Sequence, residues 1–202
     1  MSRLEDELKR VFGDPLTYPR AVIRVQVGEG SGVEAGHEEA DRMVDAGVEL
    51  VVLDSDLDTT AVTATLATLL DLEPVEVVSR TSPTWAEDVV ALRTLLRTAT
   101  TSLDQTDGGL GRLVGILERL SERRTPVLLG GGRATATAVL LVCTRSPGAE
   151  QWLLAGSTPD DTHAAQALRQ AGLTPLLDLG LGSDGADVAV AVVRAGLEAL
   201  GA

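Results

Sequence analysis

Short apolar segments that alternate with helix-forming segments constrain the fold of this chain most strongly. Each apolar segment ends in a loop rich in glycine or aspartate, and a stretch with helical spacing follows most of them. Strands that alternate with helices in this way form a parallel sheet, because each connection must cross back over the sheet. The sequence therefore predicts an α/β fold with a Rossmann-like, doubly wound, mostly parallel sheet flanked by helices. The strands are expected at residues 21–27, 49–54, 125–129, 152–155 and 176–179.

The segments between these strands predict the helices. The chain has 202 residues, with no internal repeat and no long linker, so we expect a single α/β domain over 1–202. Residues 76–79 are expected to form a short strand or a turn. Helices are expected at 3–12, 37–46, from 59 onward, and at 84–100, 108–124, 134–142, 158–171 and 184–200.

The composition excludes several classes of partner. Hydrophobic residues make up 44% of the chain but aromatic residues only 2%, so the core must consist of leucine, valine and alanine. Such a chain has no aromatic surface on which nucleic-acid bases could stack. The net charge of −13 also repels nucleic acid and anionic membrane surfaces at long range. We therefore expect neither a nucleic-acid nor a membrane partner.

Reactive side chains are scarce, which limits the available chemistry. Cys143 lies in the apolar run AVLLVC, where a buried, inert thiol is expected rather than a nucleophile. One cysteine excludes a disulfide within the chain, and with only His37 and His163 beside it no metal or cofactor is expected. The charged N-terminus MSRLEDELKR does not resemble a signal peptide, and no apolar run is long enough to span a bilayer. A cytoplasmic location is therefore expected.

An acidic loop follows the buried strand at 49–54. Asp54, Asp56 and Asp58 crowd the end of this strand, and Thr59 and Thr60 then open a helix. In a parallel sheet the ligand crevice lies at this end of the strands. The carboxylates could therefore bind a cation or include a base with a raised pKa. The alternative is that one acid caps the helix and the others are solvated.

A loop of three glycines follows the strand at 125–129. Gly130, Gly131 and Gly132 would let a ligand approach the backbone closely. The next residue, Arg133, offers an anion a bidentate partner. The loop could therefore bind an anionic ligand.

The stretch LTPLLDLGLGSDGADVAVAV, residues 173–192, contains a second glycine loop. Gly182 and Gly185 flank Asp184 just before a helix, where free N–H groups can hold an anionic ligand or an acid can take part in catalysis. The alternative is an ordinary corner between strand and helix, in which Asp184 or Asp187 caps the helix.

Several of these segments together resemble the C-terminal half of the nicotinate-nucleotide–dimethylbenzimidazole phosphoribosyltransferases. Residues 172–179, GLTPLLDL, match the family's GLxPLLDL, and His163 falls at the second histidine of its HxSxExGH segment. PVLLGGGRATATAVLL is similar to the family's PVLLDGF-type strand and loop with the alanine-rich helix that follows. AGVELVVLDSDLDTTAVTATLA is similar to GxxLxxxGExGIGNTTxAAAL, and Gly108 with Gly109 fits the GG pair before a helix. The resemblance makes residues 41–202 a phosphoribosyltransferase-like core and residues 1–40 a divergent N-terminal segment.

The resemblance implies an activity in the assembly of the lower ligand of cobalamin. The family transfers phosphoribose from nicotinate mononucleotide to a benzimidazole nitrogen, and its members are Rossmann-like homodimers. Small-molecule substrates and a homodimer or a partner subunit are therefore expected. The family's catalytic base is a glutamate in the motif GEGTG, for which Asp184 would be the surrogate here, with Asp54 or Asp56 assisting at the benzimidazole. The implied substrate- and phosphate-binding residues are Thr59, Thr60, Gly108, Gly109, Gly130, Gly131, Gly132, Arg133, Gly182, Ser183 and Gly185.

Departures from the family pattern leave two other interpretations open. Ser183 aligns with the family's glutamate without a gap, and Asp184 is one methylene shorter than glutamate. The chain is also shorter than typical members, mostly at its N-terminal side. One alternative is a catalytically degenerate relative that acts as a ligand-binding or partner subunit. The other is a generic Rossmann-like nucleotide or cation binder that uses Asp54, Asp56 and Asp58.

Overall fold

The computed structural model describes residues 3–13, 19–29, 32–98, 108–180 and 185–200. Its sheet has four parallel strands in the order β1-β2-β3-β4, which confirms the predicted α/β class. The register aligns Val25, Leu53, Leu129 and Ala155 in one row across the sheet. The four strands therefore end level with one another. The strands are β1 (Val22–Gln26), β2 (Leu50–Asp54), β3 (Val127–Leu129) and β4 (Leu153–Ala155).

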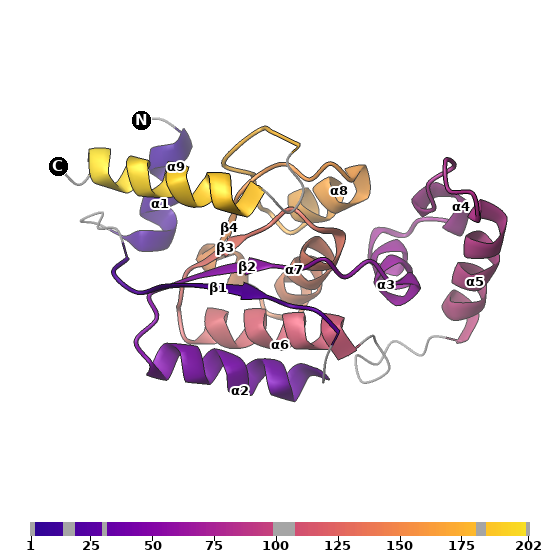
Figure 1. Cartoon of the computed structure of the whole chain (residues 1–202), viewed down its shortest axis with the longest axis horizontal. Coiled ribbons are helices and arrows are strands. Elements are labelled where there is room, and N and C mark those ends of the chain that lie inside the picture. Colours follow the sequence, from indigo (N-terminus) through magenta and orange to yellow (C-terminus); the bar gives the residue numbers. More distant parts are fainter. Residues whose placement is uncertain (1–2, 14–18, 30–31, 99–107, 181–184, 201–202) are drawn as a thin grey trace.

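One face of the sheet is covered by helices that connect successive strands (Figure 1). Helices α2 (Gly32–Asp45), α6 (Gly108–Glu122) and α7 (Arg133–Arg145) bury the side chains of Val51, Leu53 and Leu129. Helix α8 (Thr162–Gln170) packs against α7. This is the larger core, and it is built almost entirely from leucine, valine and alanine, as the low aromatic content requires.

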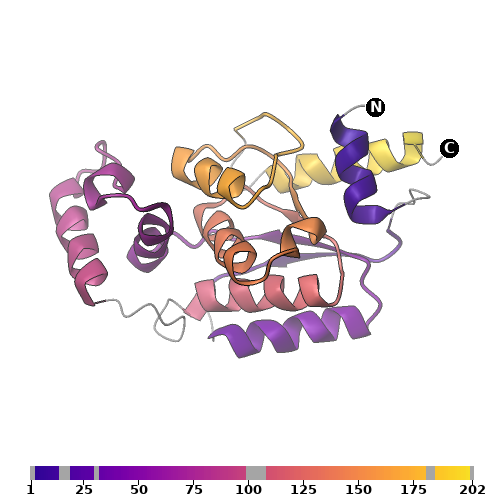
Figure 2. The ribbon, with the colours of Figure 1, turned by 180° about the vertical axis from the view of Figure 1, so that it is seen from behind.

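The opposite face is covered by helices from the two ends of the chain (Figures 1 and 2). Side chains alternate between the faces of a strand, so Leu50, Val52, Leu128 and Leu154 point to this side. Helices α1 (Arg3–Phe12) and α9 (Gly185–Leu200) bury them. The sheet is therefore flanked by helices on both faces, as the sequence predicted.

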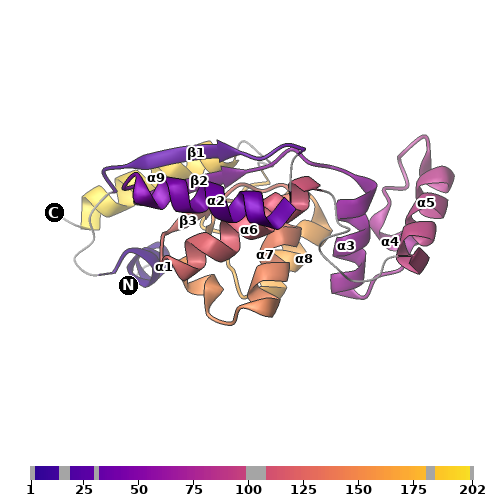
Figure 3. The ribbon, with the colours of Figure 1, turned by 90° about the horizontal axis from the view of Figure 1, so that it is seen from below.

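A helical lobe extends beyond the carboxyl ends of the strands (Figure 3). It consists of α3 (Thr60–Leu70), α4 (Pro74–Val77) and α5 (Trp85–Thr98), and it has a small apolar cluster of its own around Ala67, Val77 and Leu92. None of the helices in the described parts of the chain is long and apolar enough to cross a membrane.

Two predicted strands are wrong or incomplete. Residues 76–79, expected as a strand or turn, belong partly to α4, because Pro74 suits the first helical position and the Glu76 carboxylate accepts a hydrogen bond from the Glu73 N–H at 2.8 Å. Residues 176–179 make a single bridge, between Leu177 and Ser157. Leu177 donates to the Gly156 carbonyl at 3.1 Å and accepts from the Thr158 N–H at 2.9 Å, and in the described residues the pairing goes no further.

Several element boundaries also differ from the prediction. Helix α2 begins at Gly32 instead of residue 37, and α8 begins only at Thr162, after a loop from the end of β4. Trp152, expected in a strand, ends the 3-10 helix η2 (Ala149–Trp152) that precedes β4.

Helices α2 and α6 pack backbone against backbone. A Cβ atom on Gly115 would lie 2.9 Å from the carbonyl carbon of Val33, and one on Gly36 would lie 2.8 Å from the Ile116 nitrogen. Real Cβ atoms do not approach other atoms this closely, so the two helices depend on glycine at both positions. The close packing holds α6 against α2 and thereby fixes where α6 begins, at the carboxyl edge of the sheet.

This packing predicts that Gly115→Ala destabilises the fold. Alanine favours a helix over glycine by about 1 kcal/mol, but the added methyl group must push backbone away from backbone. We expect the free energy of unfolding to fall by about 1–3 kcal/mol, measured by urea denaturation. Gly196→Ala in α9 is the matched control, because its Cβ would meet only the ends of the Leu8 and Leu4 side chains, at 3.0 and 3.4 Å. Equal effects of the two substitutions would contradict this account.

Candidate functional site

The strand register brings Asp54 and two glycines together at the carboxyl edge of the sheet. Gln26 pairs with Asp54, and the next row continues to Gly130 and Gly156 after β3 and β4. A Cβ atom on Gly130 would lie 2.7 Å from the Asp54 Cγ, and one on Gly156 would lie 2.8 Å from the Ala189 Cβ. The Asp54 carboxyl group therefore lies over Gly130, while the first turns of α9 lie over Gly156.

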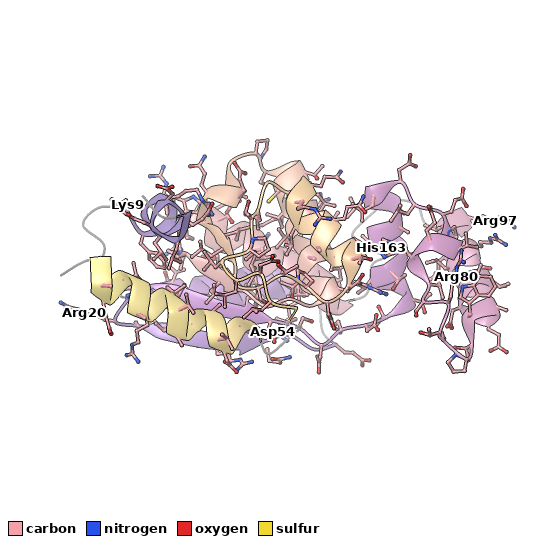
Figure 4. All side chains as sticks on the ribbon, turned by 90° about the horizontal axis from the view of Figure 1, so that it is seen from above. Lys9, Arg20, Asp54, Arg80, Arg97 and His163 are labelled. Atoms are coloured by element: carbon pink, nitrogen blue, oxygen red, sulfur yellow. The ribbon has the colours of Figure 1, made fainter. Side chains whose placement is uncertain are left out.

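Asp54 is a buried carboxyl group whose hydrogen bonding is incomplete. Its side chain is only 1% exposed, and Oδ1 accepts a hydrogen bond from the Ser55 N–H at 2.8 Å. Oδ2 has no hydrogen-bond partner within the described part of the chain, and Arg24 Nη2 lies 3.8 Å from it. Figure 4 shows Asp54 beside the N-terminal end of α9.

The pKa of Asp54 is raised above the ordinary value of an aspartate. Burial is the largest cause, and the negative charges of Asp56 and Asp187 add to it. The Ser55 N–H and the Arg24 guanidinium act in the opposite direction but do not outweigh burial. A carboxylate with a raised pKa is a stronger proton acceptor than an ordinary aspartate, which is the property predicted for this loop.

The loops after β2 and β3 pack directly on each other. Ser55 Oγ donates to the Val27 carbonyl at 2.7 Å and accepts from the Leu57 N–H at 3.2 Å. A Cβ atom on Gly132 would lie 2.6 Å from the Ser55 carbonyl oxygen. Gly130 and Gly132 thus allow the two loops to pack closely. This packing alone explains why both positions are glycine, with no ligand needed.

Arg133, predicted to bind an anion, donates to protein groups. Its Nε donates to Asp161 Oδ2 at 2.5 Å and its Nη1 to Thr63 Oγ1 at 3.0 Å. Nη1 also lies 3.5 Å from Asp58 Oδ1. An anionic ligand would have to compete with these partners for the guanidinium.

Asp161 in turn links Arg133 to the start of α8. It is the N-cap residue of that helix, and its Oδ1 accepts from the His163 N–H at 2.9 Å. Burial alone would raise the pKa of Asp161, but the hydrogen bond and charge of Arg133 outweigh it and lower the pKa. Asp161 therefore stays ionised and holds Arg133 in place.

A polar cavity of about 350 Å³ lies between the helical lobe and the start of α8. Arg133 lines it, so the loop at 130–133 connects this cavity to the contact with Asp54. His163, labelled in Figure 4, lies at the end of α8 that faces the lobe. The lining residues are Glu76, Val77, Ser79, Arg133, Asp160, Asp161, Thr162 and His163.

Sequence reasoning identified only Arg133 among these lining residues as a site residue. Asp161 had a local signal, since an aspartate before a helical run is a common N-cap. Glu76 and Ser79 had none, because only the tertiary fold carries the lobe to α8.

The other predicted residues lie at helix starts or outside the described residues. Thr59 caps α3, its hydroxyl accepting from the Val62 N–H at 3.2 Å, and Thr60 is exposed as the first residue of that helix. Gly108 begins α6, and Gly109 packs so that a Cβ would lie 2.7 Å from the Gly28 carbonyl. Gly131 and Gly185 are buried, the latter at the start of α9. Gly182, Ser183 and Asp184 lie outside the described residues.

The acidic triplet after β2 is not a cation site. Asp54 points to the α9 face of the sheet, Asp58 lies near Arg133, and Asp56 is exposed. Across the described ranges no three side chains of the metal-binding types converge. The expectation that Asp54, Asp56 and Asp58 together bind a cation is therefore not met in the described residues: Asp54 is buried, and Asp56 and Asp58 are exposed.

Cys143 is half-buried and has the properties of an inert thiol. Burial raises the pKa of this thiol to about 11, and the negative charge of Glu150 acts in the same direction. The thiolate is therefore scarce at neutral pH, and Cys143 is not a nucleophile.

Known proteins with similar sequences and structures share one enzyme name. The family described as "Phosphoribosyltransferase" matches residues 26–202. The nicotinate-nucleotide–dimethylbenzimidazole phosphoribosyltransferase of Mycobacterium tuberculosis is 33% identical over 224 aligned residues, which cover 94% of this chain and 61% of that protein. The enzyme of the same name from Mycobacterium ulcerans is 36% identical over 190 aligned residues, covering 84% of this chain and 52% of that protein.

A solved structure agrees with the sequence matches. The crystal structure of CobT from Thermus thermophilus superposes with a TM-score of 0.71 at 28% identity, covering 83% of this chain and 55% of that one. The chain thus spans between 52% and 61% of the length of these relatives. The family match covers residues 26–202, and the fold agrees with it. The chain therefore belongs to the nicotinate-nucleotide–dimethylbenzimidazole phosphoribosyltransferase family.

Proposed function

We propose that this chain transfers phosphoribose from nicotinate mononucleotide to a benzimidazole, the reaction that the names of its relatives describe. Its product would serve in the assembly of the lower ligand of cobalamin. Family membership over residues 26–202 supports the reaction class. The observation that carries the proposal within this chain is Asp54, a buried carboxyl group with a raised pKa at the carboxyl edge of the sheet.

The reaction needs a proton acceptor beside the benzimidazole. The unprotonated ring nitrogen attacks C1′ of the ribose, and the bond between C1′ and nicotinate breaks with its electron pair moving to the pyridine ring. The other ring nitrogen loses its proton to a base. A carboxylate with a raised pKa suits this step, because it binds the proton more tightly than an ordinary aspartate does.

Two acids are candidates for this base. Asp184, the surrogate that the resemblance suggested, lies outside the described residues and remains a proposal. Among the described acids we propose Asp54, with its unpartnered Oδ2 directed toward the α9 face. Asp56, proposed from the sequence as an assisting residue, is exposed in the same loop and serves as the comparison.

Helix starts at the carboxyl edge are the proposed phosphate-binding groups. Helices α3, α6, α7 and α9 all begin where the strands end, and their free N–H groups favour an anion. The exposed hydroxyl of Thr60 adds to this environment. The residues proposed for the phosphate are Thr59, Thr60, Gly108, Gly109, Gly130, Gly131, Gly132, Arg133, Gly182, Ser183 and Gly185.

The cavity beside Arg133 is the proposed entrance for the nucleotide. Arg133 and His163 contribute donors to it, while Glu76, Asp160 and Asp161 make its lining acidic. We further propose that the protein acts in the cytoplasm, as a homodimer or with a partner subunit.

A direct assay tests the proposed reaction. We expect the purified chain, incubated with nicotinate mononucleotide and 5,6-dimethylbenzimidazole, to form the benzimidazole riboside phosphate and nicotinate in equal amounts, measured by liquid chromatography and mass spectrometry. A folded chain that forms no product at high concentration, alone or with a copurifying subunit, would contradict the enzyme proposal and favour a ligand-binding or partner subunit.

Substitutions of three acids test which carboxylate is the base. Asp54→Asn should lower kcat/KM by about 10²-fold or more. Asp56→Asn should change it far less, because Asp56 is exposed and acts on Asp54 only through its charge. Loss of activity only in Asp184→Asn would assign the base to Asp184 and remove Asp54 from that role.

The pH dependence of kcat/KM provides a second test of the base. A base must be deprotonated, so activity is present above its pKa and is lost as the pH falls through it. Because burial raises the pKa of Asp54, the acid limb should lie above the ordinary aspartate range. An acid limb at or below that range would contradict the assignment.

A further inference from the structure

Asp54 lies near an ion pair, Arg24 with Asp187, that the proposed reaction does not explain. A carboxylate that is 1% exposed and has no hydrogen bond to Oδ2 is costly to keep ionised, since burial favours the protonated acid. Strand β3 has no charged residue, and Gly130, which follows it, lies beneath the carboxyl group. The charge that can oppose protonation therefore has to come from the neighbouring strand or from α9.

Arg24 supplies that charge from the edge strand β1. It pairs with Val52 in the register, so its side chain points to the same face as Asp54, which is one pleat further along. Its Nη2 lies 3.8 Å from Asp54 Oδ2, which is too long for a hydrogen bond but close for two opposite charges. In the described part of the chain no other cationic side chain forms an ion pair with Asp54.

Asp187 holds Arg24 in this position. The other guanidinium nitrogen, Nη1, donates to both oxygens of Asp187 at 2.6 and 2.7 Å. Asp187 lies in the first turn of α9, and 163 positions separate it from Arg24 in the sequence. One guanidinium thus lies between a buried carboxyl group on β2 and an exposed carboxylate on α9.

The Arg24–Asp187 pair is poorly placed to stabilise the fold. The two side chains are 46% and 62% exposed, and ion pairs between exposed groups contribute little to stability. Its effect on the adjacent buried carboxyl group is larger, because a charge beside a desolvated group is less well screened. Arg24 favours the ionised form of Asp54, while Asp187, like Asp56 in the loop after β2, disfavours it.

We propose that Arg24 is a positioning residue of the reaction, held by Asp187, and that the two together set the charge state of Asp54. The proposal rests on the proposed function, in which Asp54 is the base. Arg24 does not itself touch the substrate. It acts through Asp54, and it also ties the start of α9 to the edge strand beside the site.

The test uses the full chain and reads the ionisation of Asp54 directly. Carbon-13 NMR titration of labelled aspartate carboxyl groups, with Asp54→Asn to assign the signal, gives the pKa of Asp54 in each variant. Arg24→Gln removes the positive charge and should raise that pKa by about one unit. Asp187→Asn removes a negative charge but keeps one side-chain oxygen that can accept from Arg24 Nη1, so the guanidinium stays near Asp54 and the pKa should fall. Arg24→Lys should return the pKa most of the way toward that of the unsubstituted chain.

The proposal expects the pKa of Asp54 to shift in opposite directions in Arg24→Gln and Asp187→Asn. A purely structural ion pair is broken equally by either substitution, so both variants would then shift the pKa in the same direction or not at all, and either outcome would overturn the proposal. Arg194→Gln, which breaks the exposed pair with Glu198 elsewhere on α9, is the matched control and should leave the pKa unchanged.

The acid limb of kcat/KM separates this proposal from the proposed function. We expect the limb to move with the NMR pKa in both variants. Opposite NMR shifts in a chain without transferase activity would overturn the function and support the charge coupling. An active chain whose Asp54 signal does not respond to Arg24→Gln would overturn the coupling and leave the function standing.

Discussion

The contact of the Asp54 carboxyl group with Gly130 is the constraint on which the candidate site depends. It exists because β2 and β3 run parallel with Leu53 opposite Leu129. The next residues along the two chains, Asp54 and Gly130, therefore also lie opposite each other. A side chain at position 130 would displace the carboxyl group. A different register would place it against another residue. The apolar rows that hold the sheet together therefore also fix the position of the buried Asp54 at its carboxyl edge.

The loops around Asp54 and Gly130 make contacts on two sides, with α9 and with the helical lobe. Toward α9, Gly156 lets the first turns of the helix lie on the sheet, and Asp187 reaches Arg24 on the edge strand. Toward the lobe, Gly132 packs on the loop after β2, and the next residue, Arg133, joins Asp161 and Thr63. The glycines of this family member thus serve close packing between loops, and that packing connects the buried acid with the polar cavity. The proposed reaction needs both a proton acceptor and a place for the nucleotide, and the two features proposed for these roles, Asp54 and the polar cavity, are connected by the loop at 130–133.

Sequence reasoning predicted the parts of this arrangement that follow from local pattern. Apolar runs located the strands, and loop composition located the edge where Asp54, Gly130 and the helix starts meet. It failed where long-range pairing decides the outcome. Residues 176–179 look like a strand but pair only at Leu177, and Glu76 belongs to a short helix fixed by Pro74. The partners of Arg133 and the Arg24–Asp187 pair join distant segments, so no local pattern could have revealed them.

In the proposed reaction the benzimidazole meets the Asp54 carboxylate at the carboxyl edge of the sheet. A crystal structure of the chain soaked with 5,6-dimethylbenzimidazole would show whether it does. We expect an azole nitrogen within hydrogen-bond distance of an Asp54 carboxyl oxygen, at about 2.6–3.2 Å, with α9 beside the ring. An azole bound only in the cavity beside His163, with Asp54 still buried and untouched, would contradict it.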